Sequence, residues 1–397
     1  MKTRLRALFC DHLSIMRGKY LPSSKITNSE TRFCRSTFGV HYDKDLLPAP
    51  GSMMMEGLPD MELRWNKEDI RDSWIDSTKI VLGDLYDAEG EFLDLCPRGA
   101  LKRATAAWDK KGLTAKVGIE LEAFALQLNG DGKLVPYDAP GGVVYGTGIF
   151  SDPLGLNDAI WEVADNLGFS LDMITSEYDS PQFEYTLTFE EAVNAVDNIV
   201  LFRLMAREIA LDYGIVLTFL PKPLADAGGS GMHINYSFCD KNGLNALSVG
   251  NKNGPDLIND LARGCLSGVL YHHKGLAGLI APSANSYQRL QPGSLSGYWK
   301  NWGGDHRNVT SRIGSEGGMK SRLEHRMADA SANPYTAVAA VLQASLLGVE
   351  NGYDLQKPET GDGFEKNDAE EGTAETLDGA ISDLAADNVL CLSLIHI

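Results

Sequence analysis

Alternating polar and apolar positions mark four short segments between residues 117 and 327. Successive side chains of a β-strand point to opposite faces, so each segment is predicted to be a strand with one apolar and one polar face. Glu177 lies just ahead of the second segment. The polar faces carry, in chain order, Glu120 and Glu122; Gln182, Glu184 and Thr186; His233, Asn235 and Ser237; and Arg322, Glu324 and Arg326.

Helical periodicity appears elsewhere in the chain. Residues 101–111 form a helical pattern that ends at Gly112. Thr188 and Glu191 have the spacing of a capping box and are predicted to open a long helix that stops at Gly214. A further helix interrupted by glycines is predicted over residues 257–279. Residues 1 to about 95 mix short apolar runs with proline and glycine, which favours a small strand-rich domain.

Composition narrows the class of protein. The 397 residues suffice for two domains or one large one, and the net charge is −18. That charge argues against nucleic-acid partners and against docking on anionic membranes. The chain contains no apolar run near the roughly 20 residues of a membrane-spanning helix and shows no signal-peptide pattern. Six scattered cysteines indicate neither a disulfide scaffold nor a zinc site, so a reducing cytoplasmic location is expected.

The polar faces are costly without cations. Two carboxylates ~4 Å apart repel by roughly 1–4 kcal/mol, depending on the local dielectric. Five glutamates and one histidine form a hard oxygen-rich donor set, which suits Mg²⁺ or Mn²⁺ better than zinc. The alternative is that several of these glutamates are only paired with Arg322 and Arg326. Two arginines cannot neutralise five glutamates on four strands, so we favour divalent metals.

The same segments carry a resemblance to the glutamine synthetase family. The motifs occur in the order of that family and cover roughly residues 10–385. Within the family the chain is more similar to glutamate–amine ligases of the γ-glutamylpolyamine synthetase type than to ammonia-using enzymes. The motifs are Met16-Arg17-Gly18-Lys19, Cys96-Pro97-Arg98, Glu120-x-Glu122, Glu177 with Gln182-x-Glu184, Gly229-Ser230-Gly231-Met232-His233, Asn285-Ser286-Tyr287-Gln288-Arg289-Leu290, Arg322-x-Glu324-x-Arg326 and Ala332-Asn333-Pro334-Tyr335.

The resemblance implies an α+β fold in two domains. We expect a small N-terminal β-grasp-like domain at residues 1–97 and a catalytic domain at 98–389, built on a curved antiparallel sheet backed by helices. Residues 390–397 are expected to be a truncated or non-native tail. The family assembles as homo-oligomeric rings, often dodecamers, in which the N-terminal domain of one subunit completes the site of its neighbour.

The resemblance also assigns roles to individual residues. Two or more divalent metals would be held at each site, the first by Glu122, Glu177 and Glu184 and the second by Glu120, His233 and Glu324. Gly229, Arg289, Arg307 and Arg326 would bind the glutamate substrate. Asn235, Ser237, Arg312 and Arg322 would contact ATP, the co-substrate. Glu177 and Arg307 are expected to take part in catalysis.

Three positions depart from the family pattern. Pro181 stands where a glycine is usual, Asn235 replaces a histidine on the nucleotide side, and Leu295 replaces a glutamate of the flap that closes over ammonium. No Asp or Glu occurs between Arg289 and Asp305 to take its place.

The reaction that we expect is ATP-dependent formation of an amide between the γ-carboxylate of L-glutamate and an amine, through γ-glutamyl phosphate. The rival enzyme is an ordinary glutamine synthetase that uses ammonia. The alternative of another class is a non-catalytic relative that retains only ring assembly. Phosphate release from ATP and glutamate with a panel of amines discriminates among them.

Overall fold

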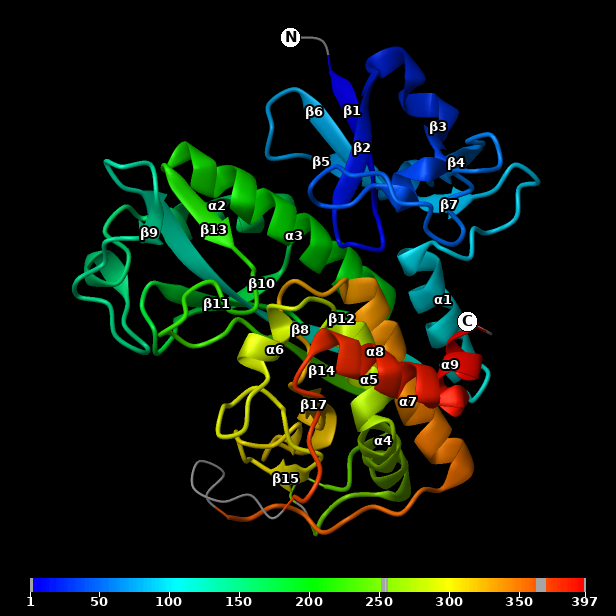
Figure 1. Ribbon diagram of the computed structural model, residues 1–397, viewed down its shortest axis with the longest axis vertical. Helices are drawn as coiled ribbons and strands as arrows, with labels where there is room; N and C mark the ends of the chain where they lie inside the picture. The colour runs from blue at the N-terminus through cyan, green and yellow to red at the C-terminus, as the bar shows by residue number, and fades with distance from the viewer. Residues whose placement is uncertain (1–2, 251–253, 255, 362–368, 396–397) are drawn as a thin grey trace. The chain divides into compact units, whose positions relative to one another are not determined.

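The computed structural model describes residues 3–250, 254, 256–361 and 369–395. The chain divides into two compact units, Met1–Arg103 and Ala104–Ile397. The first unit contains the strands drawn in blue and light blue in Figure 1, and the second contains the long central sheet and most of the helices. The domain boundary predicted between residues 97 and 98 stays a prediction.

The N-terminal unit contains two small sheets. In one, with strand order β2-β1-β6-β5, β1 pairs antiparallel with β2 and parallel with β6, which is a β-grasp-like arrangement. The other has the order β3-β4-β7. Alternate β1 residues Leu5, Ala7 and Phe9 are buried in the core beside Met61 and Leu63. The strands are β1 (Arg4–Cys10), β2 (Met16–Pro22), β3 (Glu30–Cys34), β4 (Asp60–Arg64), β5 (Arg71–Asp72), β6 (Thr78–Leu82) and β7 (Asp84–Tyr86).

The C-terminal unit is built on one large sheet with the order β10-β11-β8-β14-β17-β16-β15. Strands β9, β12 and β13 also pair with β8. The sheet was expected to be antiparallel; it is mixed, because β15 and β16 run parallel. The strands are β8 (Thr114–Leu128), β9 (Leu134–Pro136), β10 (Leu171–Ser176), β11 (Gln182–Leu187), β12 (Glu190–Glu191), β13 (Ile215–Thr218), β14 (Met232–Cys239), β15 (Trp302–Gly304), β16 (Ser311–Ile313) and β17 (Leu323–His325).

Helices cover the apolar face of this sheet. Figure 1 shows α3 alongside the long strand β8, and most of the apolar side chains of α3 are buried. Helices α4 and α7 pack so closely that a Cβ on Gly264 would lie 2.9 Å from a side-chain carbon of Val349. The helices are α1 (Pro97–Asp109), α2 (Leu156–Leu167), α3 (Ala192–Asp212), α4 (Asp260–Tyr271), α5 (His273–Ile280), α6 (Ser286–Arg289), α7 (Pro334–Asn351), α8 (Leu377–Ala386) and α9 (Asn388–Ile395).

The predicted capping box is wrong. Helix α3 begins after Glu191, and no side chain caps its first turn. The Thr188 hydroxyl instead donates to the backbone oxygen of Ser170, at 3.0 Å. Glu190 and Glu191 pair with β8 as strand β12, so the backbone reaches the helix in an extended conformation that the box does not allow.

The single helix predicted over residues 257–279 is two helices that meet at His272. The ring of His272 is fully buried, and its Nδ1 lies 2.7 Å from an oxygen of Asp387, just beyond α8. His273 contacts the backbone oxygen of Tyr298 through Nε2, at 3.0 Å. Both contacts join the helix junction to distant parts of the chain, which explains why local sequence did not predict the break.

The C-terminal residues Asn388–Ile395 form α9. Residues 396 and 397 of the tail that we expected to be truncated or non-native lie outside the described residues. Among the helices that the structure describes, none is both long enough and apolar enough to cross a bilayer.

Candidate metal and substrate site

The register of the central sheet builds an acidic face around β8. Glu122 lies directly opposite Glu184 of β11, and Glu120 lies directly opposite His233 of β14. The intervening residues of these strands point the other way and are buried against the helices. They are Ile119, Leu121, Ala123, Phe183, Tyr185, Met232 and Ile234. The strand register therefore brings Glu120, Glu122, Glu184 and His233 to one face of the sheet.

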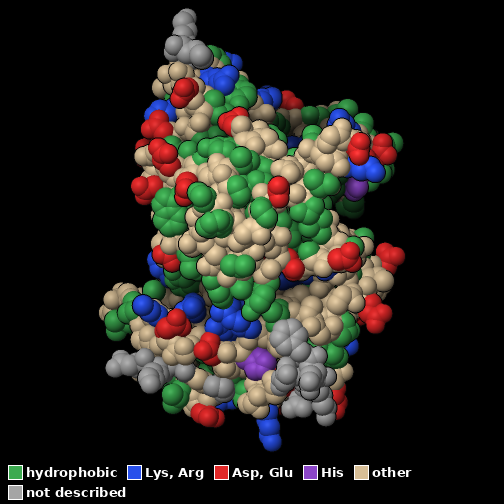
Figure 2. Space-filling view, turned by 90° about the vertical axis from the view of Figure 1, so that its left-hand side faces the viewer, with side chains coloured by type: hydrophobic (Ala, Val, Ile, Leu, Met, Phe, Trp, Pro, Cys, Tyr) green, Lys and Arg blue, Asp and Glu red, His purple; other side chains and the backbone are tan. Residues whose placement is uncertain are grey.

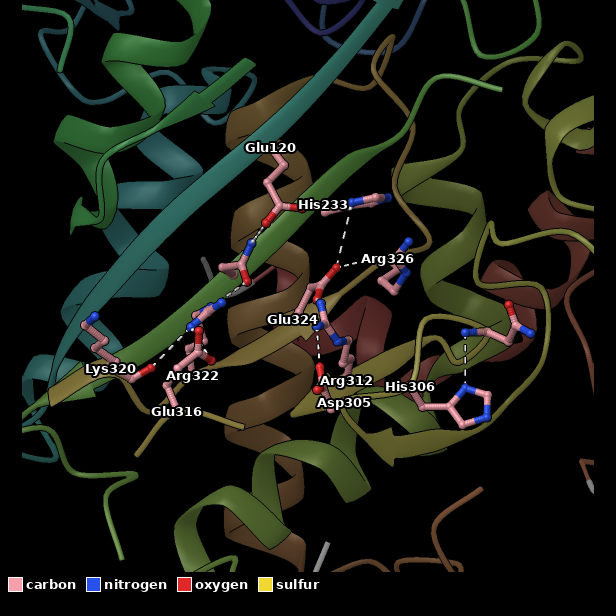
Figure 3. Close-up of polar contacts among 12 residues, drawn as sticks. Glu120, His233, Asp305, His306, Arg312, Glu316, Lys320, Arg322, Glu324 and Arg326 are labelled. Atoms are coloured by element: carbon pink, nitrogen blue, oxygen red, sulfur yellow. Dashed lines mark hydrogen bonds and ion pairs between the residues drawn. The ribbon is translucent and has the colours of Figure 1, made fainter. Parts of the chain in front are cut away.

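His233 is the centre of this face. Its Nδ1 lies 3.1 Å from an oxygen of Glu120 and 3.7 Å from an oxygen of Glu324, and its Nε2 lies 3.7 Å from an oxygen of Glu122. Figure 3 shows Glu120 and Glu324 converging on His233 from β8 and β17. Ligand atoms of Glu120, Glu184 and His233 also lie within 4.8 Å of one another. An imidazole with several carboxylates at this spacing fits a hard divalent cation.

Electrostatics on the acidic face disfavour ionisation without a cation. Burial raises the pKa of Glu184, and the neighbouring carboxylates of Glu120, Glu122 and Glu177 raise it further. Burial and the charge of Glu122 likewise raise the pKa of Glu177. Both carboxylates lie among other carboxylates, and burial strengthens the repulsion between them. A bound cation would relieve this repulsion.

Glu324 lies in the opposite environment. Burial opposes its ionisation, but Arg326, His233 and Arg312 together outweigh burial and lower the pKa of this carboxyl. One carboxylate oxygen accepts a hydrogen bond from Arg326, and the other accepts one from Arg312 at 2.8 Å (Figure 3). The alternative of arginine pairing thus applies to Glu324, whereas no described arginine forms an ion pair with the other four predicted carboxylate ligands.

A cavity of about 870 Å³ opens beside this face. Four of the six predicted metal ligands line it, namely Glu122, Glu177, Glu184 and His233. All of the residues predicted to bind glutamate also line it, namely Gly229, Arg289, Arg307 and Arg326. The structure therefore gathers four of the six predicted metal ligands and all four residues predicted to bind glutamate around one space, whereas Glu120 and Glu324 do not line it.

Arg289 retains donors for a ligand although it supports the fold. Its Nη1 donates to the backbone oxygen of Met327 at 2.8 Å, and its Nη2 donates to that of Arg326 at 3.1 Å. A guanidinium has five N–H donors, so three remain. Arg326 lies beside it, nearly buried, with its Nε unpaired within the described structure. Two buried guanidiniums that line one cavity have the chemistry that binds a carboxylate or a phosphate.

The residues predicted to contact the nucleotide lie along the sheet rather than on the cavity wall. The Asn235 amide donates to Glu120 at 3.0 Å and accepts from Nε of Arg322 at 3.1 Å. Arg322 also pairs with Glu316 (Figure 3). Arg312 bonds to Glu324 and Asp305, and Ser237 is buried on β14. Asn235 therefore links the acidic face to Arg322, and the four nucleotide assignments stay predictions.

Gly229 and Gly231 allow a close approach between backbone and side chains. A Cβ on Gly229 would lie 2.5 Å from Cγ of Arg289 and 2.7 Å from the backbone oxygen of Pro221. A Cβ on Gly231 would lie 2.7 Å from both Arg289 and His233. Only glycine fits at these two positions, because any larger residue would displace the arginine and the histidine.

Pro181 stands where the family pattern has a glycine, and the predicted metal ligands on either side of it still line the cavity. The peptide before Pro181 is cis. The backbone N–H of Glu177 donates to Gln182, and that of Gln182 donates to Asp179, which closes the turn. Glu177 and Glu184 both line the cavity on either side of this turn.

Several cavity residues were not predicted from the sequence. Tyr145 is one, and its backbone has a φ of 59°, which is uncommon for a residue other than glycine. The nearby apolar side chains of Val143, Ile149 and Phe150 are also exposed. Figure 2 shows hydrophobic side chains gathered on the middle of one face of the molecule. Others are Tyr178, Asp179 and Lys222. Leu295 also lines the cavity. It stands where the family pattern has a glutamate, so it gives the cavity an apolar side chain in place of a charged one.

The sequence of this chain matches that of known proteins. The family model described as glutamine synthetase, catalytic domain, matches residues 94–395. The glutamine synthetase of Pyrococcus woesei is 30% identical over 359 residues, covering 88% of this chain and 76% of that protein. That of Staphylococcus epidermidis is 32% identical over 289 residues, covering 72% of this chain and 63% of that protein.

Two solved structures resemble this chain in both fold and sequence. A structure described as apo GmaS without ligand has a TM-score of 0.85 and 27% identity, with 99% of this chain and 89% of that chain covered. A GmaS complex with ADP has a TM-score of 0.84 and 26% identity, with 99% and 90% covered.

We expect about two divalent metal ions to bind, because the carboxylates of the acidic face outnumber the arginine side chains that pair with them. Titration of Mn²⁺ by calorimetry measures this number. Glu184→Gln removes a charged ligand but keeps the size of the side chain, so the affinity of one site should fall about tenfold or more. Glu324→Gln should weaken the second site.

Asp172→Asn is the matched control for charge, because Asp172 is exposed on β10 and does not line the cavity. Its titration should match that of the unchanged protein. Two unaltered sites in both Glu184→Gln and Glu324→Gln would show that the ligand assignment is wrong.

The metal-free protein should lose stability as pH rises. The pKa values of Glu177 and Glu184 are raised in the folded state, whereas unfolded glutamates release their protons near pH 4.3. Above that pH the folded protein holds protons that the unfolded chain has lost, so these two groups destabilise the fold progressively. Melting temperatures measured with a chelator should therefore fall less steeply with pH in Glu184→Gln. Parallel curves would contradict the electrostatic account.

Proposed function

The chain belongs to the glutamine synthetase family, and from that premise we propose that it joins the γ-carboxylate of L-glutamate to an organic amine, using ATP. The family membership establishes an ATP-dependent ligase of the glutamine synthetase type. The amine, the γ-glutamyl phosphate intermediate and the roles of individual residues are our proposal. We also propose a cytoplasmic homo-oligomeric ring, whose subunit number light scattering would measure.

The observation that carries the proposal is one cavity whose lining combines carboxylates with guanidiniums. The carboxylates include Glu177 and Glu184, and the guanidiniums are those of Arg289, Arg307 and Arg326. A reaction between two anions, ATP and glutamate, needs cations to bring them together and groups that hold each in place. A relative with the same fold has been solved with ADP, which supports a nucleotide as one of the two.

The chemistry requires activation of the carboxylate. An amine cannot displace oxide from a carboxylate, but it can displace phosphate from an acyl phosphate. Bound Mg²⁺ or Mn²⁺, held by the six predicted ligands, would neutralise charge on the phosphates and on the group in transfer. Arg307 is exposed at the cavity and forms no ion pair within the described residues, so it is available to an incoming phosphate.

Glu177 is suited to accept a proton from the amine. It lines the cavity in which the proposed reaction takes place. An amine must be deprotonated to attack, and a carboxylate beside the reacting centre can take that proton. Arg289 and Arg326, which line the same cavity, bind the substrate carboxylate in this arrangement.

Leu295 favours an organic amine over ammonia. Ammonium is small and strongly hydrated, so an enzyme that uses it needs a carboxylate to attract it. Leu295 provides an apolar side chain on the cavity wall instead, which can contact the methylenes of an alkylamine. The next acid along the chain, Asp305, is engaged by Arg312 at 2.6 Å. At position 295 the chain therefore lacks the carboxylate that the ammonia-using alternative needs.

The amine preference has a direct test. We expect kcat/KM for methylamine, ethanolamine, putrescine or spermidine to exceed that for ammonium at one pH, because Leu295 contacts alkyl groups. A preference for ammonium of tenfold or more, which is ~1.4 kcal/mol in the transition state, would identify a glutamine synthetase. Absence of phosphate release with every amine would instead support the non-catalytic relative.

Leu295→Glu should move the preference toward ammonium. The substitution introduces a carboxylate on the wall, so kcat/KM for ammonium should rise relative to that for the best alkylamine by about tenfold. Leu295→Gln has a similar size without the charge and serves as the control. An equal effect of both variants would show that side-chain volume rather than charge sets the preference.

Arg289→Lys separates binding from support of the fold. Lysine keeps the charge but cannot hold a carboxylate with two parallel hydrogen bonds, so KM for glutamate should rise about tenfold. Loss of one backbone hydrogen bond should lower the stability by only about 1 kcal/mol. A large fall in melting temperature with an unchanged KM would give Arg289 a purely structural role.

A further inference from the structure

His306 is a cavity residue to which the proposed reaction assigns no role. It lies one position before Arg307, and both residues line the cavity together with Gly361. The Nε2 atom of His306 lies 2.7 Å from the backbone oxygen of Gly361, 55 residues later in the chain. Its Nδ1 atom accepts the backbone N–H of Asn308 at 3.2 Å (Figure 3). The ring therefore joins two segments of the cavity wall that are distant in sequence.

These two contacts require one tautomer of the imidazole. The carbonyl of Gly361 can only accept a hydrogen bond, so Nε2 must carry a hydrogen. The backbone N–H of Asn308 can only donate, so Nδ1 must be unprotonated. The neutral ring with its hydrogen on Nε2 satisfies both partners. Both ring nitrogens are thus occupied, which fits a bridge between two segments better than acid–base catalysis.

The far end of the bridge is itself held in place. The backbone N–H of Glu359 donates to the backbone oxygen of Trp302 in β15 at 2.7 Å. The indole N–H of Trp302 donates in turn to the backbone oxygen of Gln356 at 2.8 Å. The buried side chain of Glu359 accepts the backbone N–H of Gly361 at 3.0 Å. The carbonyl of Gly361 therefore offers His306 a fixed partner.

The near end of the bridge is the loop that carries Arg307. Asp305, where this loop begins, has a φ of 48°, and its carboxylate accepts a hydrogen bond from Arg312 at 2.6 Å. Val309, where the loop ends, is fully buried. Arg307 lies between them, is exposed, and forms no ion pair within the part of the chain that the structure describes. Its direction therefore depends on the loop backbone, which His306 ties to a distant segment.

We infer that His306 is a positioning residue, which holds this loop so that Arg307 faces the cavity. The inference rests on the proposed function, in which Arg307 meets an incoming phosphate. A loop without the bridge would let the arginine sample several directions, and ordering it on the substrate would then weaken binding. The contact with Gly361 makes that ordering part of the fold.

Substitutions of His306 separate its two contacts. Glutamine places an N–H near the position of Nε2, so His306→Gln keeps the contact with Gly361. Asparagine places an oxygen near the position of Nδ1, so His306→Asn keeps only the contact with Asn308. We expect kcat/KM for ATP to fall about tenfold in His306→Asn and less than about threefold in His306→Gln, because the contact with Gly361 carries the bridge. Equal losses in the two variants, or no loss in either, would overturn the inference.

A double-mutant cycle tests whether His306 acts through Arg307. In a chain that already carries Arg307→Ala, the further substitution His306→Asn should lower kcat/KM for ATP less than about twofold, because the arginine that it positions is gone. A fall as large as the one in the unchanged background overturns the inference, since His306 would then act on the fold or on the substrate directly.

Equilibrium binding separates the inference from the proposed function. Calorimetry measures the affinity of the full-length protein for ATP with Mg²⁺ but without glutamate or amine, so it requires no turnover. His306→Asn and Arg307→Ala should each weaken binding, and the double variant should bind no more weakly than Arg307→Ala alone. That pattern supports the inference even if no amide is ever formed. An affinity that Arg307→Ala weakens but His306→Asn leaves unchanged overturns it even if amide formation is efficient.

Discussion

The opposition of Glu122 and Glu184 across β8 and β11 is the constraint on which the site depends. Like charges directly opposite each other on neighbouring strands destabilise a sheet, and Glu120 adds a third carboxylate on the same face of β8. The apolar side chains on the back of these strands are almost wholly buried, so the strand register is fixed from behind. Because the register cannot slip, the carboxylates cannot separate, and the repulsion is held in place for a cation to relieve.

Charge changes sign from one side of the sheet to the other. The acids of β11 and β8 come first, His233 of β14 follows, and Glu324 of β17 lies between the histidine and Arg312 of β16. Glu324 therefore joins an acidic region to a basic one, and its lowered pKa shows that the basic neighbours dominate there. Such a gradient suits an anionic substrate that is held by cations on one side and by guanidiniums on the other.

The sequence predicts the strands of the site and the faces of their side chains, because a period of two is a local property. It does not predict which strand lies next to which. Thr188 satisfied a capping pattern yet bonds to Ser170, and the helix junction at His272 depends on Asp387, which lies 115 residues later. Asp179 carries no motif, and its position becomes informative only when Gly228, 49 residues away, is seen to donate to it. The family resemblance supplied the grouping of distant residues that local patterns do not contain.

The proposed reaction treats two ammonium groups differently in one cavity. The α-ammonium of glutamate must stay charged and fixed, whereas the amine must lose its proton before it attacks. Leu295 adds no charge on the wall that it lines, and therefore does not stabilise the protonated amine. Glu177, a carboxylate that lines the same cavity, is then the group suited to take the proton.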